Sequence, residues 1–178
     1  RQYDSAGTAQ TGETLVNTTT STNQDRPAVA TPTERDLFVV WSGNVPGDST
    51  GAAGQLYRRD PVVDGTEFRV NTSTSGVQRT SSVAADNAGN FVVAWQSRHS
   101  GRYHVYYQRY NASGVAQGSE TLANTTMTGN QFFPSVAMDD AGDFVVSWTS
   151  DQTGNYDVYF QRYNSSGVAQ GSETRANT

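Results

Sequence analysis

An internal repeat of about 53 residues is the feature of this sequence that most limits how the chain can fold. The segment FVVSW at residues 144–148 returns as FVVAW at 91–95 and as LFVVW at 37–41. A second block, YNSSGVAQGSETRANT at residues 163–178, returns at 110–125 and, with more differences, at 3–18. Repeats of this length form solenoids, propellers or arrays, in which each unit buries its apolar face against the next.

Each repeat contains four short segments that have the composition of β-strands. In the last repeat they are about residues 133–138, 144–149, 157–163 and 173–177, separated by turns rich in Gly, Ser, Asn and Asp. Helical periodicity is found nowhere. The sequence therefore predicts an all-β, propeller-like repeat, with four-stranded blades at residues 23–75, 76–128 and 129–178 and an extra outer strand in a partial repeat at 1–22. A β-sandwich is the alternative, because regularly spaced short strands also fit it.

Three predicted blades are too few to close a ring, because propellers have about four to eight. The sequence also begins without a methionine and partway through a predicted blade, which indicates a processed form or an excerpt. We therefore expect further repeats, or other copies of the chain, to act as partners that complete the ring. An open blade face and an unpaired strand edge would promote such association.

Composition narrows the cellular setting and the classes of partner. The net charge is -5 with no basic run, so we do not expect nucleic-acid binding. No apolar run approaches the roughly 20 residues needed to cross a bilayer, so membrane insertion is not expected either. The absence of cysteine excludes disulfides and thiolate metal sites. Few charges and many polar turns are typical of secreted β proteins, which predicts an extracellular or cell-surface location.

The segments QRYNASG, GSETLANT, NQFFPSVAMDDAGDFVVSW and VYFQRYNSSG resemble tandem repeats of large secreted or surface-attached bacterial proteins, many of them adhesin-like. A more distant resemblance is to sialidase-type propeller blades, although their Ser-x-Asp-x-Gly motif is replaced here by Asp-x-x-Gly at residues 86–89 and 139–142. The resemblance implies an extracellular structural or adhesive module that associates with itself, even as a fibre subunit. A lectin-like carbohydrate-binding propeller is the alternative. The loop at residues 150–156 and its equivalents differ most between repeats, which favours the scaffold over a repeated lectin site.

Catalytic motifs are not recognisable in the sequence. The two histidines, His99 and His104, lie in or beside one loop of the second repeat, and the matching positions in the third are Gln152 and Asp157. No Ser-His-Asp arrangement, phosphate loop, HExxH motif or matched carboxylate pair is found. We therefore expect a protein that is not an enzyme, with no catalytic residues and no cofactor.

Calcium is the one metal that the sequence makes plausible. Asp139, Asp140 and Asp143 place three carboxylates within five residues, and Ca²⁺ prefers oxygen ligands. Asp and Asn are equally common in such turns because their side chains bond the backbone. The second repeat has Asp86, Asn87 and Asn90 there, so no ligand set is repeated, which favours the turn interpretation.

Carbohydrate contacts are predicted where the second strand of each repeat ends. Trp148 and its equivalents Trp41 and Trp95 lie beside polar loops, although a tryptophan at the same place in every repeat is more typical of packing between blades. If a glycan binds, the candidates are Gln24, Asn130, Gln131, Trp148, Asp151, Asn155 and Tyr156.

Arginine and glutamate recur at matched positions around the outer hairpin. We expect ion pairs with a structural role that tie the two outer strands together, or one blade to the next. The predicted pairs are Arg59 with Glu67, Arg109 with Glu120, and Arg162 with Glu173.

Overall fold

The computed structural model describes residues 1, 3–32, 36–45, 47–58, 63–99 and 101–178. The described residues form three antiparallel sheets of four strands each. The first has the order β1-β2-β3-β4, the second β5-β6-β7-β8 and the third β9-β10-β11-β12. The strands are β1 (Gln24–Ala30), β2 (Asp36–Val45), β3 (Asp48–Arg58), β4 (Val63–Arg69), β5 (Val77–Ala85), β6 (Phe91–His99), β7 (Arg102–Tyr110), β8 (Ala116–Leu122), β9 (Gln131–Met138), β10 (Phe144–Ser150), β11 (Asp157–Tyr163) and β12 (Ala169–Arg175).

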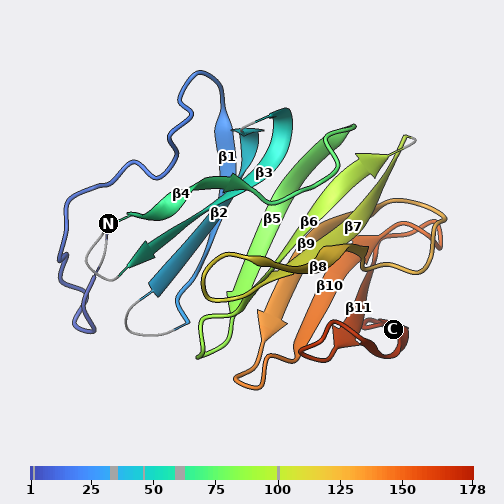
Figure 1. Cartoon of the computed structure of the whole chain (residues 1–178). Helices are drawn as coiled ribbons and strands as arrows, with labels where there is room; N and C mark the ends of the chain where they lie inside the picture. Colours follow the sequence, from blue (N-terminus) through green and yellow to red (C-terminus); the bar gives the residue numbers. More distant parts are fainter. Residues whose placement is uncertain (2, 33–35, 46, 59–62, 100) are drawn as a thin grey trace.

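The three sheets lie side by side in sequence order, each built from consecutive strands (Figure 1). The first strands of neighbouring sheets contact one another, β1 with β5 and β5 with β9. This arrangement confirms the prediction of four-stranded, propeller-like blades and differs from a sandwich of two facing sheets. None of the described residues belongs to a helix long and apolar enough to cross a membrane.

A side-chain turn closes the first hairpin of the second and third sheets. In the third sheet the Asp139 carboxylate accepts hydrogen bonds from the amides of Ala141 and Asp143, both at 3.0 Å. Gly142 follows with φ of 82°, a left-handed conformation that glycine adopts without strain. The Asp-x-x-Gly pattern therefore encodes the turn that joins β9 to β10.

A buried glutamine occupies a bulge between the two outer strands of every sheet. The pairing of β7 with β8 is interrupted at Gln108, and that of β11 with β12 at Gln161. The Gln108 amide nitrogen donates to the carbonyls of Arg109, Gln117 and Gly118, at 3.0 to 3.4 Å. Gln161 makes the same three contacts in the third sheet. These amides satisfy carbonyls that the bulge removes from the strand ladder.

Apolar cores fill the spaces between neighbouring sheets. Each sheet has a back face toward the preceding repeat, which in β10 carries Phe144, Val146 and Trp148, and a front face toward the next repeat, which in β10 carries Val145 and Ser147. The back face of β10 packs on Val92, Ala94, Val105 and Tyr107 of the second sheet. The same contact joins the first two sheets, where Phe38 stacks on Phe91 with ring centroids 4.3 Å apart.

Two hydrogen-bonded links accompany every back face. The hydroxyl of Tyr110 donates to the carbonyl of Val70, and that of Tyr163 to the carbonyl of Ala123. The Glu120 carboxylate accepts the amide and hydroxyl of Thr72, at 2.7 and 2.9 Å. The equivalent links are Tyr57 to Val16, Glu67 to Thr18, and Glu173 to Thr125.

These links replace the predicted arginine–glutamate pairs. Glu120 and Glu173 bind the chain just beyond the outer strand of the preceding repeat, because its free amides and threonine hydroxyl accommodate a carboxylate directly. Arg109 instead donates to the Ser165 carbonyl of the next repeat at 2.6 Å, and the Arg162 side chain is exposed. Arg59 lies outside the described residues. The glutamates do connect successive repeats, but through the backbone.

Residues 1–22 differ from the predicted outer strand. Their described part contains one isolated antiparallel bridge, Tyr3 to Ala9, and Val16 and Thr18 lie against the back face of the first sheet. An outer strand needs an inner strand beside it, and no described strand lies there to pair with it. The N-terminal segment therefore occupies the place of a preceding repeat without forming a sheet (Figure 1).

Candidate functional site

A repeated bulge distorts the first strand of every sheet. Arg26, Thr80 and Phe133 hold the equivalent position and have φ of 54°, 58° and 50°, all left-handed although none is glycine. The pairing of β1, β5 and β9 with the neighbouring strand is interrupted around these residues. Such a conformation costs roughly 1 kcal/mol or more and concentrates at functional sites. The bulges redirect three unlike side chains at one end of the sheets.

Four aromatic side chains gather at this end, from the starts of β7 and β9 and from the residue just before β11. Phe132 is central, with ring centroids 5.8 Å from Tyr103, 5.8 Å from Phe133 and 6.2 Å from Tyr156. Tyr156 and Phe133 are 73% and 60% exposed. We call Tyr103, Phe132, Phe133 and Tyr156 the loop-end aromatic cluster. The half-buried ring of Phe132 packs against the rings of Phe133 and Tyr156, which are open to solvent.

Arginines and a rigid polar pair border the loop-end aromatic cluster. The guanidinium carbons of Arg79 and Arg98 lie 4.9 and 5.7 Å from the Tyr103 ring centroid. Asn130 accepts the Tyr103 amide at 3.2 Å, and its own amide groups donate to the Asp151 carboxylate. Exposed aromatic faces beside fixed hydrogen-bonding groups suit a ligand with an apolar face and a rim of hydroxyls.

Hydrogen bonds from Asn130 keep Asp151 ionised. They lower the pKa of the Asp151 carboxyl below its ordinary value of 3.8, and the charge of Arg102 acts in the same direction. Because the folded-state pKa is the lower one, this link adds stability above pH 3.8, and the contribution is lost as the pH falls through the folded-state pKa.

We expect the loops that carry Asn130 and Asp151 to loosen in acid. In a pH titration followed by NMR, the side-chain amide signals of Asn130 should shift with a midpoint below pH 3.8. Asp151→Asn should remove this step while keeping the side-chain shape. A midpoint at or above pH 3.8, or the same step in the variant, would contradict the assignment.

The structure brings some of the predicted ligand residues together and buries others. Asn130, Asp151, Asn155 and Tyr156 lie at the loop end. Trp148 is 1% exposed and packs in the core behind β10, so its ring cannot serve as a sugar platform.

Two predicted glutamines also have structural roles. Gln131 is fully buried and donates to the carbonyls of Thr126 and Thr128, and Gln24 donates to the carbonyl of Asn44. Gln78 holds the same place in the second sheet and donates to the Ser75 carbonyl. Gln78 and Gln131 thus secure the chain leading into the first strand of their sheets, whereas Gln24 binds the end of β2.

The predicted calcium ligands do not converge. Asp139 bonds its own turn, Asp143 accepts the Ser165 amide at 2.9 Å, and Asp140 is exposed. Among the described residues, no three His, Cys, Asp or Glu side chains are placed to share a metal ion. The Asp139 and Asp143 carboxylates at this turn accept hydrogen bonds from backbone amides.

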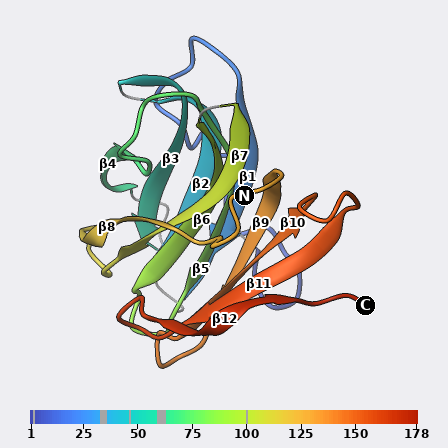
Figure 2. The same cartoon turned by 90° about the vertical axis from the view of Figure 1, so that its right-hand side faces the viewer.

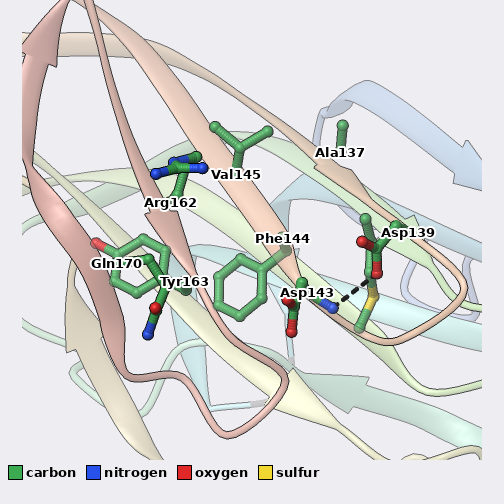
Figure 3. Close-up of a pocket in the computed structure, with 9 residues that line it drawn as sticks. Ala137, Asp139, Asp143, Phe144, Val145, Arg162, Tyr163 and Gln170 are labelled. Atoms are coloured by element: carbon green, nitrogen blue, oxygen red, sulfur yellow. Dashed lines mark hydrogen bonds between the residues drawn. The ribbon is translucent and has the colours of Figure 1, made fainter.

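The opposite end of the third sheet contains a pocket of about 400 Å³ (Figure 3). We call it the corner pocket. Phe144 and Tyr163 lie at its centre, Asp143 and Asp139 at one side, and Val145 and Arg162 at the other. The equivalent residues of the second sheet form a smaller pocket that Met138, Ala141, Gly142 and Ser165 of the third repeat close. The corner pocket therefore corresponds to a site that, in the second sheet, is closed by the neighbouring blade.

Sequence reasoning missed Tyr103, Phe132, Phe133 and the two arginines near them. These residues differ between repeats, so a search for positions that the repeats share does not find them. Phe132 and Phe133, for example, stand where the second repeat has Arg79 and Thr80. The available signal was the contrast itself: two adjacent aromatics occur in one repeat at the start of an otherwise matching strand.

No protein-family model and no curated protein matches the sequence. Solved structures do match the fold. An α-L-arabinofuranosidase from Lactobacillus brevis has a TM-score of 0.58 at 12% identity, covering 100% of this chain and 71% of that one. An endo-arabinase from Bacteroides thetaiotaomicron has a TM-score of 0.51 at 15% identity, covering 85% of this chain and 61% of the other.

A third match is an α-L-arabinofuranosidase from Podospora anserina in complex with cellotriose, with a TM-score of 0.52 at 8% identity. It is covered over 54% of its length, by 80% of this chain. The chain thus spans less than two thirds of two of these three proteins. Its sheets are propeller blades. At these identities the likeness establishes the fold alone.

The prediction that this chain is not an enzyme is overturned by these matches, because proteins with this fold include an endo-arabinase and two α-L-arabinofuranosidases. That prediction rested on the absence of familiar motifs, and a fold that enzymes use does not need them within one short segment. None of the three is an adhesin, so the resemblance to adhesin-type repeats gains no support from them.

Proposed function

We propose that this chain is a carbohydrate-binding propeller module and that the loop-end aromatic cluster holds the sugar. The observation that carries the proposal is the exposure of Tyr156 and Phe133 on a common support, Phe132, beside the Asn130–Asp151 pair. A sugar ring packs its C–H face on an aromatic ring and bonds its hydroxyls to amide, carboxylate and guanidinium groups. The loop end offers all of these.

The matched structures indicate which sugars to test first. Two are arabinofuranosidases, one is an endo-arabinase, and one of them holds cellotriose. We therefore propose polysaccharides that contain arabinose or glucose as the ligand class. Such polysaccharides occur outside the cell, which supports an extracellular location for this protein.

The test is calorimetric titration of the full chain with arabino-oligosaccharides and with cellotriose. A shallow site of two open rings should bind with a Kd of roughly 0.1–1 mM. Release of reducing sugar is measured in the same samples, so that hydrolysis is detected if it occurs. Absence of binding to every sugar in the panel at concentrations well above this range would overturn the proposal.

A further inference from the structure

The front face of the third sheet has the composition of a buried interface but is open to solvent. Val158 is 43% exposed, whereas its equivalent in the second sheet, Val105, is fully buried under the third sheet. Val145 and Phe160 are half-buried, whereas their equivalents Val92 and Tyr107 in the second sheet are buried. In Figure 2 no described part of the chain covers the side of β10 and β11 turned away from the second sheet.

The end of the third repeat has residues at the positions that, in the second repeat, bind the tyrosine and glutamate of the next blade. Ala176 and Thr178 hold the positions of Ala123 and Thr125, which receive the Tyr163 hydroxyl and the Glu173 carboxylate. Ala123 is buried, whereas Ala176 and Thr178 are exposed. The corner pocket lies on the same side and lacks the residues that close its equivalent in the second sheet. The exposed apolar face, the exposed positions 176 and 178 and the open corner pocket thus all correspond to parts of the internal contacts between blades.

The complementary half of this contact lies at the other end of the molecule. Val29, on the back face of the first sheet, is 60% exposed, whereas its equivalents Val83 and Val136 are 8% exposed. A pocket of about 200 Å³ remains between this face and the N-terminal segment, lined on one side by Val29, Leu37, Val39 and Tyr57 and on the other by Arg1, Thr11, Thr14 and Val16. The N-terminal segment covers the back face only loosely.

We propose that the front face of the third sheet binds the back face of the first sheet of a second copy of this chain. Both surfaces repeat an interface that the structure already contains twice, so their apolar side chains and hydrogen-bonding groups are matched in type and register. In the docked pair, Ala176 and Thr178 of one copy receive the Tyr57 hydroxyl and the Glu67 carboxylate of the other. Residues 16–18, which hold those positions in the single chain, are displaced.

Sequence similarity makes this exchange feasible. The segment AQGSETRANT at residues 169–178 matches AQTGETLVNT at 9–18, and both end in threonine, the residue that binds the glutamate carboxylate in these links. The exchange replaces a loosely packed segment by a whole sheet, so apolar burial favours it. Two copies supply six sheets, which lies within the range of about four to eight at which propellers close.

The experiment measures the mass of the full chain by sedimentation velocity over a wide range of concentrations, since association follows mass action. The wild-type chain should approach twice its 19.2 kDa mass. Val158→Lys and Val29→Glu each place a charge inside the proposed contact and should weaken association roughly 100-fold or more. Val115→Lys is the matched control, since Val115 is equally apolar and 56% exposed but lies in the outer hairpin of the second sheet, and it should associate like wild type.

Mixing the two variants separates a specific contact from loss of folding. In a mixed pair one junction is native and the other joins the introduced lysine to the introduced glutamate, so association should return. Circular dichroism of each variant should match wild type, because both positions are solvent-exposed in the single chain. A wild-type chain that remains at 19.2 kDa, or a Val158→Lys variant that associates as wild type does, would overturn the proposal.

Discussion

Replacing Trp95 by alanine is expected to lower the free energy of unfolding by about 3–5 kcal/mol. The Trp95 side chain is completely buried in the core between the first two sheets. Truncation removes its contacts with both sheets and leaves a cavity, and an ordinary domain is stable by only about 5–15 kcal/mol. The variant should therefore be partly unfolded at ordinary temperature, as measured by urea denaturation followed by far-UV circular dichroism.

Two companion variants show whether this loss comes from interblade packing. Trp95→Phe keeps most of the ring and removes an indole N–H that finds no hydrogen-bond partner among the described residues, so it should cost much less than alanine. Val115→Ala, in an exposed hairpin, should stay within about 0.5 kcal/mol of wild type. Equal effects of Trp95→Ala and Val115→Ala would show that the sheets do not pack as described.

Tyr156→Ala is expected to weaken carbohydrate binding by about 1–2 kcal/mol, which corresponds to roughly 5–30-fold in Kd. The ring is mostly exposed and contacts the rest of the loop-end aromatic cluster through Phe132, so its removal takes away contact area for the ligand. The free energy of unfolding should change by less than about 0.5 kcal/mol for the same reason. Calorimetric titration and urea denaturation measure the two quantities on the same sample.

A matched tyrosine supplies the control for this prediction. Tyr3 is also largely exposed, at 60%, but belongs to the N-terminal segment. Tyr3→Ala should leave the sugar affinity unchanged. If Tyr3→Ala and Tyr156→Ala weaken binding to the same extent, the sugar is not held at the loop end.

The strands were predictable because several local signals agree. β10 and β11 begin at the residues that the sequence indicated, and the Asp-x-x-Gly turn lies between β9 and β10. The repeat itself supplied the number of blades, since each copy must bury its apolar strands against the next. The described part of residues 1–22 does not form the predicted outer strand, because a strand needs a neighbouring strand to pair with. Local sequence does not reveal whether that neighbour is there.

The partners of individual polar side chains were not predictable. Glu120 and Gln131 look like ordinary surface residues, yet one binds the preceding repeat and the other is fully buried against loop carbonyls. Both roles depend on which backbone groups the fold leaves without a partner, and only the assembled sheets determine that. The loop-end aromatic cluster joins residues from β7, from β9 and from the loop before β11, so a search along one repeat could not find it.

The most direct test of the account is an NMR titration of the ¹⁵N-labelled chain with the sugar that binds best in the calorimetric panel. Shifts confined to Phe133, Asn130, Asp151, Tyr156 and their immediate neighbours are expected, because these residues form one open surface. Shifts concentrated at the opposite end of the sheets, around Asp143 and Tyr163 in the corner pocket, or no shifts at saturating sugar, would contradict the account.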